Sequence, residues 1–404
     1  MSSLSEALSQ LRKGGMIILV DDEDRENEGD LVMAAEFATP EAVNFMARFG
    51  RGLICMPMAG PMIDRFGLPP MVSNNKARRS TAFTVSIEAR EGITTGISAH
   101  DRARTIAAGC NPDAKPDDIV SPGHIFPLRA ALGGVLIRAG HTEGSVDLMT
   151  LAGLRPAAVI CEIMSDDGTM ARRADLDTFA KEHGLPILTI QAIVQYRKKT
   201  EMLVEEVARS ELPTAFADEP LQVHAFRSLI DGIEHLALVK YPLPATPLVR
   251  VHSECLTGEA LGSLRCDCGP QLHESIRLVS ESDGGIVIYM RGHEGRGIGL
   301  ANKILAYGLQ DKGHDTIEAN TALGFAPDKR DYAAAAHILK ALGVSALVLL
   351  SNNPDKARAL TDFGLDVVRQ QPMIITPNPF NASYLATKRD RMGHTYHLET
   401  RNPS

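Results

Sequence analysis

Short apolar runs alternate with charged, helix-like segments along the whole chain. In the first half, MIILV (16–20), AAVICEIM (157–164) and LPILTI (185–190) have the length and composition of buried strands. GGIVIYM (284–290) and ALVLLS (346–351) repeat this pattern in the second half. Because helical segments separate these runs, the pattern predicts an α/β (α+β) fold with mixed sheets in both halves.

Local signals add detail to this pattern. Ser3 and Glu6 form a capping box that starts a helix, and residues 39–41 combine an N-cap threonine, a proline and an acidic first turn. TAFTVSIEA (81–89) alternates as a strand does, and we expect another strand within GGVLIRAG (133–140).

A charged helical pattern from about Thr189 to Ser210 lies between the two halves and ends at Pro213. We interpret it as a helical connector between two mixed-sheet domains. A chain of 404 residues is long enough for two domains of ordinary size. The predicted domains are 1–200 and 201–404.

Composition excludes several classes of protein. Apolar residues make up 44% and charged residues 23%, as in soluble globular proteins, and no apolar run approaches the roughly 18–20 residues of a membrane span. The net charge is −8 and neither half is basic, which argues against nucleic acid as a partner. With no apolar signal segment at the start, we expect a cytoplasmic protein with free thiols.

The segment DDEDRENEGD (21–30) packs seven carboxylates into ten residues. Such a run is usually a solvated loop, but this one directly follows a predicted buried strand, where α/β proteins bind ligands. Clustered carboxylates repel one another unless a cation lies among them, and Mg²⁺ favours carboxylates together with substrate oxygens. Its Arg25 could also pair with an anion.

Three other places in the first half are candidates. The stretch from Arg138 to Thr142 joins a predicted strand to a helix, where backbone N–H groups favour a phosphate. His141 in this stretch is either a metal ligand or a structural residue. Glu162 is a carboxylate in an apolar strand, which is costly unless it is paired or protonated. His124 is a weaker candidate of the same kind.

In the second half, Cys255, Cys266 and Cys268 lie within one short segment. Three protein ligands and an open fourth position are typical of catalytic zinc, whereas His252 or His273 could complete a structural site. RGHEGRGIGL (291–300) is glycine-rich and suits phosphates, although it fits neither the P-loop nor the dinucleotide-binding pattern.

Four motifs, DDEDRENEGD, TAFTVSIEAREGITTGISAHDRARTI, SPGHIFPLRA and GHTEGSVDL, closely resemble 3,4-dihydroxy-2-butanone 4-phosphate synthase over about residues 1–200. The resemblance implies conversion of ribulose 5-phosphate to 3,4-dihydroxy-2-butanone 4-phosphate and formate with Mg²⁺ or Mn²⁺. It implies Glu26 and His141 as metal ligands and His124 and Glu162 as catalytic residues, with Glu28 and Cys55 as weaker candidates. The implied substrate contacts are Arg25, Glu26, Asp30, Arg138, Ala139, Gly140, His141, Thr142 and Glu162.

RVHSECLTGEALGSLRCDCGPQ, RGHEGRGIGL, DTIEAN, GFAPDKRDY, LLSNNPDK and TKRDRMGH closely resemble GTP cyclohydrolase II over roughly residues 205–395. The resemblance implies hydrolysis of GTP to 2,5-diamino-6-ribosylamino-4(3H)-pyrimidinone 5′-phosphate, formate and pyrophosphate. It implies Zn²⁺ on Cys255, Cys266 and Cys268, with Mg²⁺ on the GTP phosphates. The implied GTP contacts are Arg250, Val251, His252, Ser253, Glu254, Gln271, Glu294, Gly295, Arg296, Thr316, Ser351 and Lys356.

The same resemblance makes Asp328 a proton acceptor and Arg330 a nucleophile. Arginine is almost never deprotonated in proteins, so stabilising charge at the α-phosphate is an equal interpretation of Arg330. Ser351 stands where the family pattern has threonine.

Together the two resemblances imply a bifunctional riboflavin biosynthesis enzyme, and both families act as homodimers. The sequence is also compatible with two alternatives. One is a fusion with a single active half. The other is a non-catalytic, zinc-containing module that binds a nucleotide.

Overall fold

The computed structural model describes residues 2–325 and 330–382, and the chain divides into two compact units, Met1–Arg197 and Lys198–Ser404. Each unit is built on one seven-stranded mixed sheet flanked by helices, which confirms the predicted fold class. In the part of the chain that the structure describes, no helix is long and apolar enough to cross a membrane.

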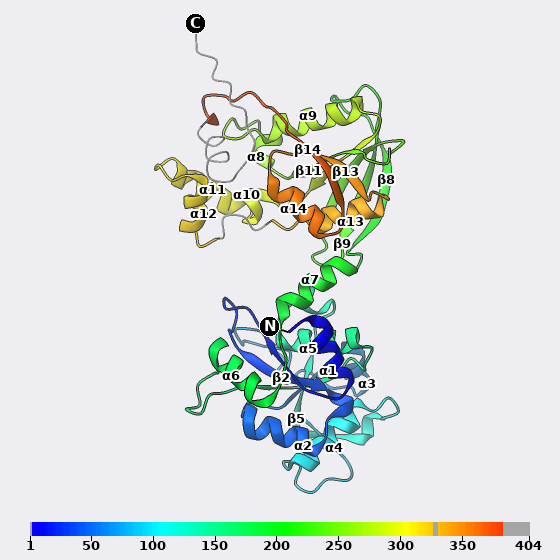
Figure 1. Ribbon diagram of the computed structural model, residues 1–404, viewed down its shortest axis with the longest axis vertical. Helices are drawn as coiled ribbons and strands as arrows, with labels where there is room; N and C mark the ends of the chain where they lie inside the picture. The colour runs from blue at the N-terminus through cyan, green and yellow to red at the C-terminus, as the bar shows by residue number, and fades with distance from the viewer. Residues whose placement is uncertain (1, 326–329, 383–404) are drawn as a thin grey trace. The chain divides into compact units, whose positions relative to one another are not determined.

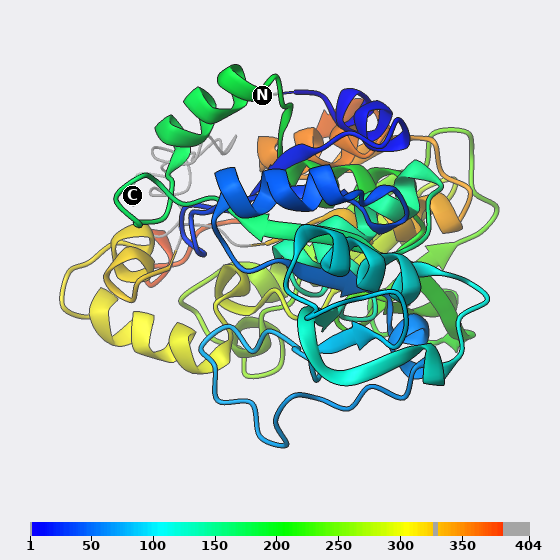
Figure 2. The ribbon, with the colours of Figure 1, turned by 90° about the horizontal axis from the view of Figure 1, so that it is seen from below.

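The N-terminal unit has the strand order β4-β5-β3-β6-β2-β1-β7. Its strands are β1 (Ile17–Val20), β2 (Gly29–Ala34), β3 (Cys55–Met58), β4 (Ile87–Ala89), β5 (Ile119–Arg129), β6 (Ala158–Glu162) and β7 (Ile187–Thr189). Its helices are α1 (Leu4–Arg12), α2 (Pro40–Phe45), α3 (Gly60–Arg65), α4 (Ala99–Cys110), α5 (His141–Ala152), α6 (Arg173–His183) and α7 (Ile190–Thr200), the last of which continues past the division between the units. Helices α1, α5 and α7 bury apolar side chains on one face of the sheet, and α2, α4 and α6 do so on the other (Figure 1, and Figure 2 from below).

The C-terminal unit has the strand order β14-β13-β11-β12-β10-β9-β8. Its strands are β8 (Val204–Leu212), β9 (Leu221–Ser228), β10 (Glu234–Lys240), β11 (Leu248–Ser253), β12 (Gly285–Met290), β13 (Ala346–Leu350) and β14 (Asp366–Gln371). Its helices are α8 (Leu256–Glu259), α9 (Cys268–Glu281), α10 (Glu294–Gly297), α11 (Leu300–Gln310), α12 (Thr316–Ala322), α13 (Ala333–Ala341) and α14 (Pro354–Asp362). Helix α9 packs on one face of this sheet, and α13 and α14 pack on the other.

Three sequence predictions about elements need correction. The helical connector ends at Thr200, and the charged stretch that follows is strand β8 rather than helix. The predicted strand at 133–140 is instead a short 3₁₀ turn, because Gly133 and Gly134 take left-handed φ values of 92° and 61°. The alternating run at 81–89 forms a strand only in its last three residues.

Candidate active sites

The acidic segment forms the loop between the antiparallel strands β1 and β2, whose ends pair Val20 with Gly29. The carboxylate of Asp21 organises the loop by accepting hydrogen bonds from the backbone N–H groups of Glu26 (3.1 Å) and Glu28 (2.9 Å). These bonds fold the loop back on itself, so that the side chain of Glu26 lies beside the start of α5.

Asp21, Glu26 and His141 form what we call the acidic-loop site: each offers one ligand atom, and these atoms lie within 4.8 Å of one another. His141 Nε2 and Asp30 Oδ1 are buried 3.9 Å apart, and neither atom has a hydrogen-bond partner among the described residues. Burial lowers the pKa of His141, so the ring is neutral at pH 7, which is the form that binds a metal. The donor set therefore fits a hard divalent cation. Asp21 was not among the residues predicted from the sequence, although its position directly after a buried strand indicates a possible ligand.

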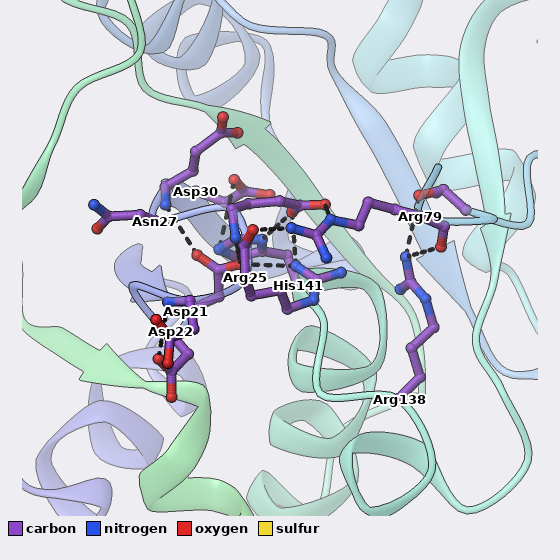
Figure 3. Close-up of polar contacts among 12 residues, drawn as sticks. Asp21, Asp22, Arg25, Asn27, Asp30, Arg79, Arg138 and His141 are labelled. Atoms are coloured by element: carbon purple, nitrogen blue, oxygen red, sulfur yellow. Dashed lines mark hydrogen bonds and ion pairs between the residues drawn. The ribbon is translucent and has the colours of Figure 1, made fainter. Parts of the chain in front are cut away.

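Two arginines face the N-terminus of α5 beside this site. Arg25 donates to Asp21 (2.8 Å) and to Glu26 (2.6 Å), and Arg138 donates to Glu143 (2.7 Å). A Cβ atom on Gly140 would lie 2.6 Å from Arg138 Nη1 and 2.8 Å from Arg25 Nη2, so both guanidinium groups reach the same backbone position. Figure 3 shows Arg25 beside His141, with Arg138 to one side. Guanidinium groups around a helix N-terminus suit a phosphate.

The two predicted catalytic residues have separate surroundings. Glu162 ends β6 opposite Asp30 of β2 and accepts a hydrogen bond from the backbone of Leu53 (2.8 Å). His124 lies on β5, where its Nδ1 atom is 2.6 Å from Glu88 Oε1. Glu88 could not be predicted from the sequence as the partner of His124, because the two residues come together only through the pairing of β4 with β5.

Cys255, Cys266 and Cys268 form what we call the three-cysteine site at the start of α8 and α9, and their sulfur atoms lie within 4.8 Å of one another. Gly258 makes room for them, because a Cβ atom there would lie 2.7 Å from Cys266 Sγ. The donor set fits zinc.

Among the residues that the structure describes, no fourth His, Cys, Asp or Glu joins this cluster. The two histidines considered as a fourth ligand have other partners. His252 Nε2 lies 2.7 Å from Glu259 Oε1, and His273 stacks on Phe216 with ring centroids 3.9 Å apart. Burial lowers the pKa of His252 to about 4, so this ring is also neutral.

A pocket opens beside the three-cysteine site. Predicted nucleotide contacts that line it are Arg250, His252, Ser253, Glu254, Gln271, Glu294, Gly295, Arg296, Ser351 and Lys356, together with Arg330. Val251 is buried in β11, and its carbonyl accepts a hydrogen bond from Lys356 (2.7 Å). Asp328 lies outside the described residues, as does the side chain of Thr316.

The glycine-rich segment after β12 forms one wall of this pocket. Gly295, Arg296 and Gly297 take left-handed φ values of 59°, 67° and 86°, which is the backbone that glycine permits and other residues rarely adopt. The wall is tied to the segment that directly follows β11, because the N–H group of Gly292 donates to Glu254 Oε2 (2.8 Å).

The pocket also contains Lys303 and Tyr307 from α11, which the sequence analysis missed because neither belongs to a motif. Burial alone would lower the pKa of Lys303, but hydrogen bonds to Glu294 and Cys255 raise it above its usual value. The side chain is therefore an ammonium ion.

Comparisons with known proteins identify one enzyme family in each half of the chain. The family model described as 3,4-dihydroxy-2-butanone 4-phosphate synthase matches residues 5–196, and that described as GTP cyclohydrolase II matches residues 205–372. The riboflavin biosynthesis protein RibBA of Aquifex aeolicus (strain VF5) is 54% identical over 399 residues, which are 98% of each chain. The bifunctional riboflavin biosynthesis protein RIBA 1, chloroplastic, of Arabidopsis thaliana is 49% identical over 402 residues, covering 98% of this chain and 74% of that protein.

Among solved structures, the chain is similar to RibBX of A. baumannii, described as a two-domain 3,4-dihydroxy-2-butanone 4-phosphate synthase. The TM-score is 0.68 with 39% identity, over 93% of this chain and 100% of that one.

These findings define a two-domain enzyme with lyase and hydrolase activities. The chain belongs to the family of bifunctional riboflavin biosynthesis proteins, which join 3,4-dihydroxy-2-butanone 4-phosphate synthase to GTP cyclohydrolase II. Both resemblances stated from the sequence motifs are thereby confirmed.

Proposed function

We propose that the N-terminal unit acts on ribulose 5-phosphate at the acidic-loop site, with Glu26 and His141 holding Mg²⁺ or Mn²⁺ and Asp21 completing the donor set. The observation that carries this proposal is the convergence of three ligand atoms beside the buried, unpartnered atoms of Asp30 and His141. When bound, the cation supplies charge stabilisation for an enediolate.

Other side chains around this site bind the substrate or transfer protons. Arg25, Arg138 and the N-terminus of α5 bind the sugar phosphate and so fix the position of the carbonyl carbon. The carboxylate of Glu162 takes and returns protons beside that carbon. Glu88 holds His124 through Nδ1, which leaves Nε2 to exchange a proton with the substrate.

In the C-terminal unit we propose that Cys255, Cys266 and Cys268 hold zinc and that GTP, with Mg²⁺ on its phosphates, occupies the adjoining pocket. When bound, zinc supplies a Lewis acid and an ionisable water near neutral pH. Arg250 is held in the pocket by hydrogen bonds to the Leu350 carbonyl (3.0 Å) and to Gln271 (2.6 Å).

Arginines of the pocket bind the phosphates in this proposal. Arg296 lies on the glycine-rich wall, where the backbone allows close approach to a phosphate. Arg330 Nη1 lies 3.4 Å from Ser253 Oγ, and the guanidinium group stabilises charge at the α-phosphate rather than acting as the nucleophile. Asp328 stays a prediction for the proton acceptor.

We also propose a homodimer, as the resemblance implies, which light scattering of the purified chain would test.

RibBX is described as a synthase alone, so two domains do not by themselves require two activities. The decisive experiment measures formate released from ribulose 5-phosphate and from GTP in separate reactions of one purified sample. We expect formate from both; release from only one substrate would leave a single active half and overturn the proposal.

A further inference from the structure

Lys303 is a buried cation with acceptors for all three of its N–H groups. Its side chain is 10% exposed, and Nζ lies 2.5 Å from Glu294 Oε1, 2.9 Å from Thr257 Oγ1 and 3.1 Å from Cys255 Sγ. An ammonium group has three donors, so these contacts use it fully. One side chain of α11 therefore touches both a proposed zinc ligand and a predicted nucleotide contact.

The partners of Lys303 are themselves held in place. Glu294 Oε2 accepts a hydrogen bond from the backbone of Leu256 (2.7 Å), and Thr257 Oγ1 lies 3.1 Å from the hydroxyl of Tyr307. The network joins α8, the glycine-rich wall and α11 around Cys255. Loss of the ammonium would leave the carboxylate of Glu294 buried without its cation, which is costly.

Charge gives Lys303 a role beyond packing. Cysteine binds zinc as the thiolate, so three cysteines and one Zn²⁺ carry a net charge of about −1. Cys255 and Cys266 are buried, so this charge is poorly solvated. The Lys303 ammonium against Cys255 balances it, and partners of this kind tune metal affinity.

We propose that Lys303 is a positioning residue that fixes Cys255 as a metal ligand and holds Glu294 in the GTP pocket. The proposal rests on zinc at the three-cysteine site. It assigns Lys303 no direct part in bond making.

The test compares the zinc affinities of wild-type and variant full-length chains, each measured by competition with a chromogenic chelator. We expect Lys303→Met to weaken zinc binding by about 10–100-fold and to lower kcat/KM for GTP, while turnover of ribulose 5-phosphate stays unchanged. The matched control is Lys312→Met, an exposed lysine just beyond α11, which should retain wild-type affinity. Wild-type zinc affinity in Lys303→Met would overturn the proposal.

Cobalt substitution gives an absorption spectrum that would not change if Lys303 only packed against its neighbours. Removal of a positive hydrogen-bond donor from a thiolate should shift its sulfur-to-cobalt charge-transfer band to longer wavelength, and an unshifted band would contradict the proposal. If Lys303→Met does not fold, Lys303→Gln is tested in the same way, since it removes the charge but keeps a donor. Should zinc remain bound in Cys268→Ser, the zinc assignment itself fails, and this outcome is distinct from failure of the Lys303 proposal.

Discussion

Both the acidic-loop site and the three-cysteine site place a cationic side chain against proposed metal ligands, but they do so differently. Arg25 lies 2.8 Å from Asp21 and 2.6 Å from Glu26 in a loop, with 16% of its side chain exposed, and its guanidinium group also reaches Gly140 at the start of α5. Lys303 lies 3.1 Å from Cys255 and is enclosed by three partners within the pocket. In our proposal the first cation binds the substrate phosphate as well as balancing charge, whereas the second only holds the site together.

The two sites also differ in their donor atoms. Carboxylates and a neutral imidazole suit Mg²⁺ or Mn²⁺, and three thiolates suit zinc. Because the two sets share no residue and lie in separate units, each activity should respond to substitutions in its own site alone.

The largest expected effect comes from removal of one thiolate. Cys268→Ser should lower GTP turnover by about three orders of magnitude or more, because the bound metal provides several kcal/mol of transition-state stabilisation. Formate assays with each substrate measure the two activities separately. Ribulose 5-phosphate turnover should be unchanged, and a parallel loss of both activities would break the independence of the sites.

The reciprocal substitution is Glu26→Ala in the acidic loop. It should lower ribulose 5-phosphate turnover by about 100–1,000-fold through loss of the metal, with GTP turnover intact. Glu23→Ala is the matched control, because Glu23 is an exposed carboxylate of the same loop. Equal effects of the two substitutions on ribulose 5-phosphate turnover would mean that the activity depends on the negative charge of the loop as a whole and not on Glu26 as a specific ligand.

A smaller effect should follow from crowding Glu162. In Gly52→Ala the new Cβ atom would lie 2.4 Å from Glu162 Oε2 and also 2.6 Å and 2.7 Å from the backbone oxygen and nitrogen of Glu162, so both the carboxylate and the backbone that carries it must shift. We expect kcat for ribulose 5-phosphate to fall by about 10–100-fold, as misplacement of a reacting group does. Gly308→Ala, where a Cβ atom meets nothing within 4 Å, should leave both activities unchanged. Wild-type kcat in Gly52→Ala would argue against a catalytic carboxylate at Glu162.

The smallest expected effect is at Ser351. Its hydroxyl accepts a hydrogen bond from the N–H group of Asn353 (3.1 Å), and threonine keeps this hydroxyl. Ser351→Thr should therefore change the KM for GTP by less than about threefold in a steady-state assay. A much larger shift would show that the missing methyl group adapts this pocket to its nucleotide.

The sequence predicted the parts of the fold whose residues carry a local pattern. The buried strands β1, β6, β12 and β13 are apolar runs, so their burial is visible in the sequence. Strand β8 was mistaken for helix because it is an edge strand with only Val204 buried, and its exposed side chains leave no alternating apolar pattern.

Candidate ligands could be recognised where they lie close together in the sequence, as in the acidic loop and the cysteine segment. Site residues could not be recognised where tertiary packing brings single residues together. Glu88 reaches His124 only through pairing of β4 with β5, and Lys303 reaches Cys255 only because α11 packs beside α8. Such residues belong to ordinary strand or helix sequence and carry no signal of their own.

Anomalous diffraction at the zinc absorption edge, on crystals of the full chain, would show directly whether the three cysteines bind zinc. We expect one zinc ion bound by the sulfur atoms of Cys255, Cys266 and Cys268, with a non-protein ligand in the fourth position. An absent peak at these sulfur atoms, or a fourth ligand from an amino-acid side chain, would contradict this expectation.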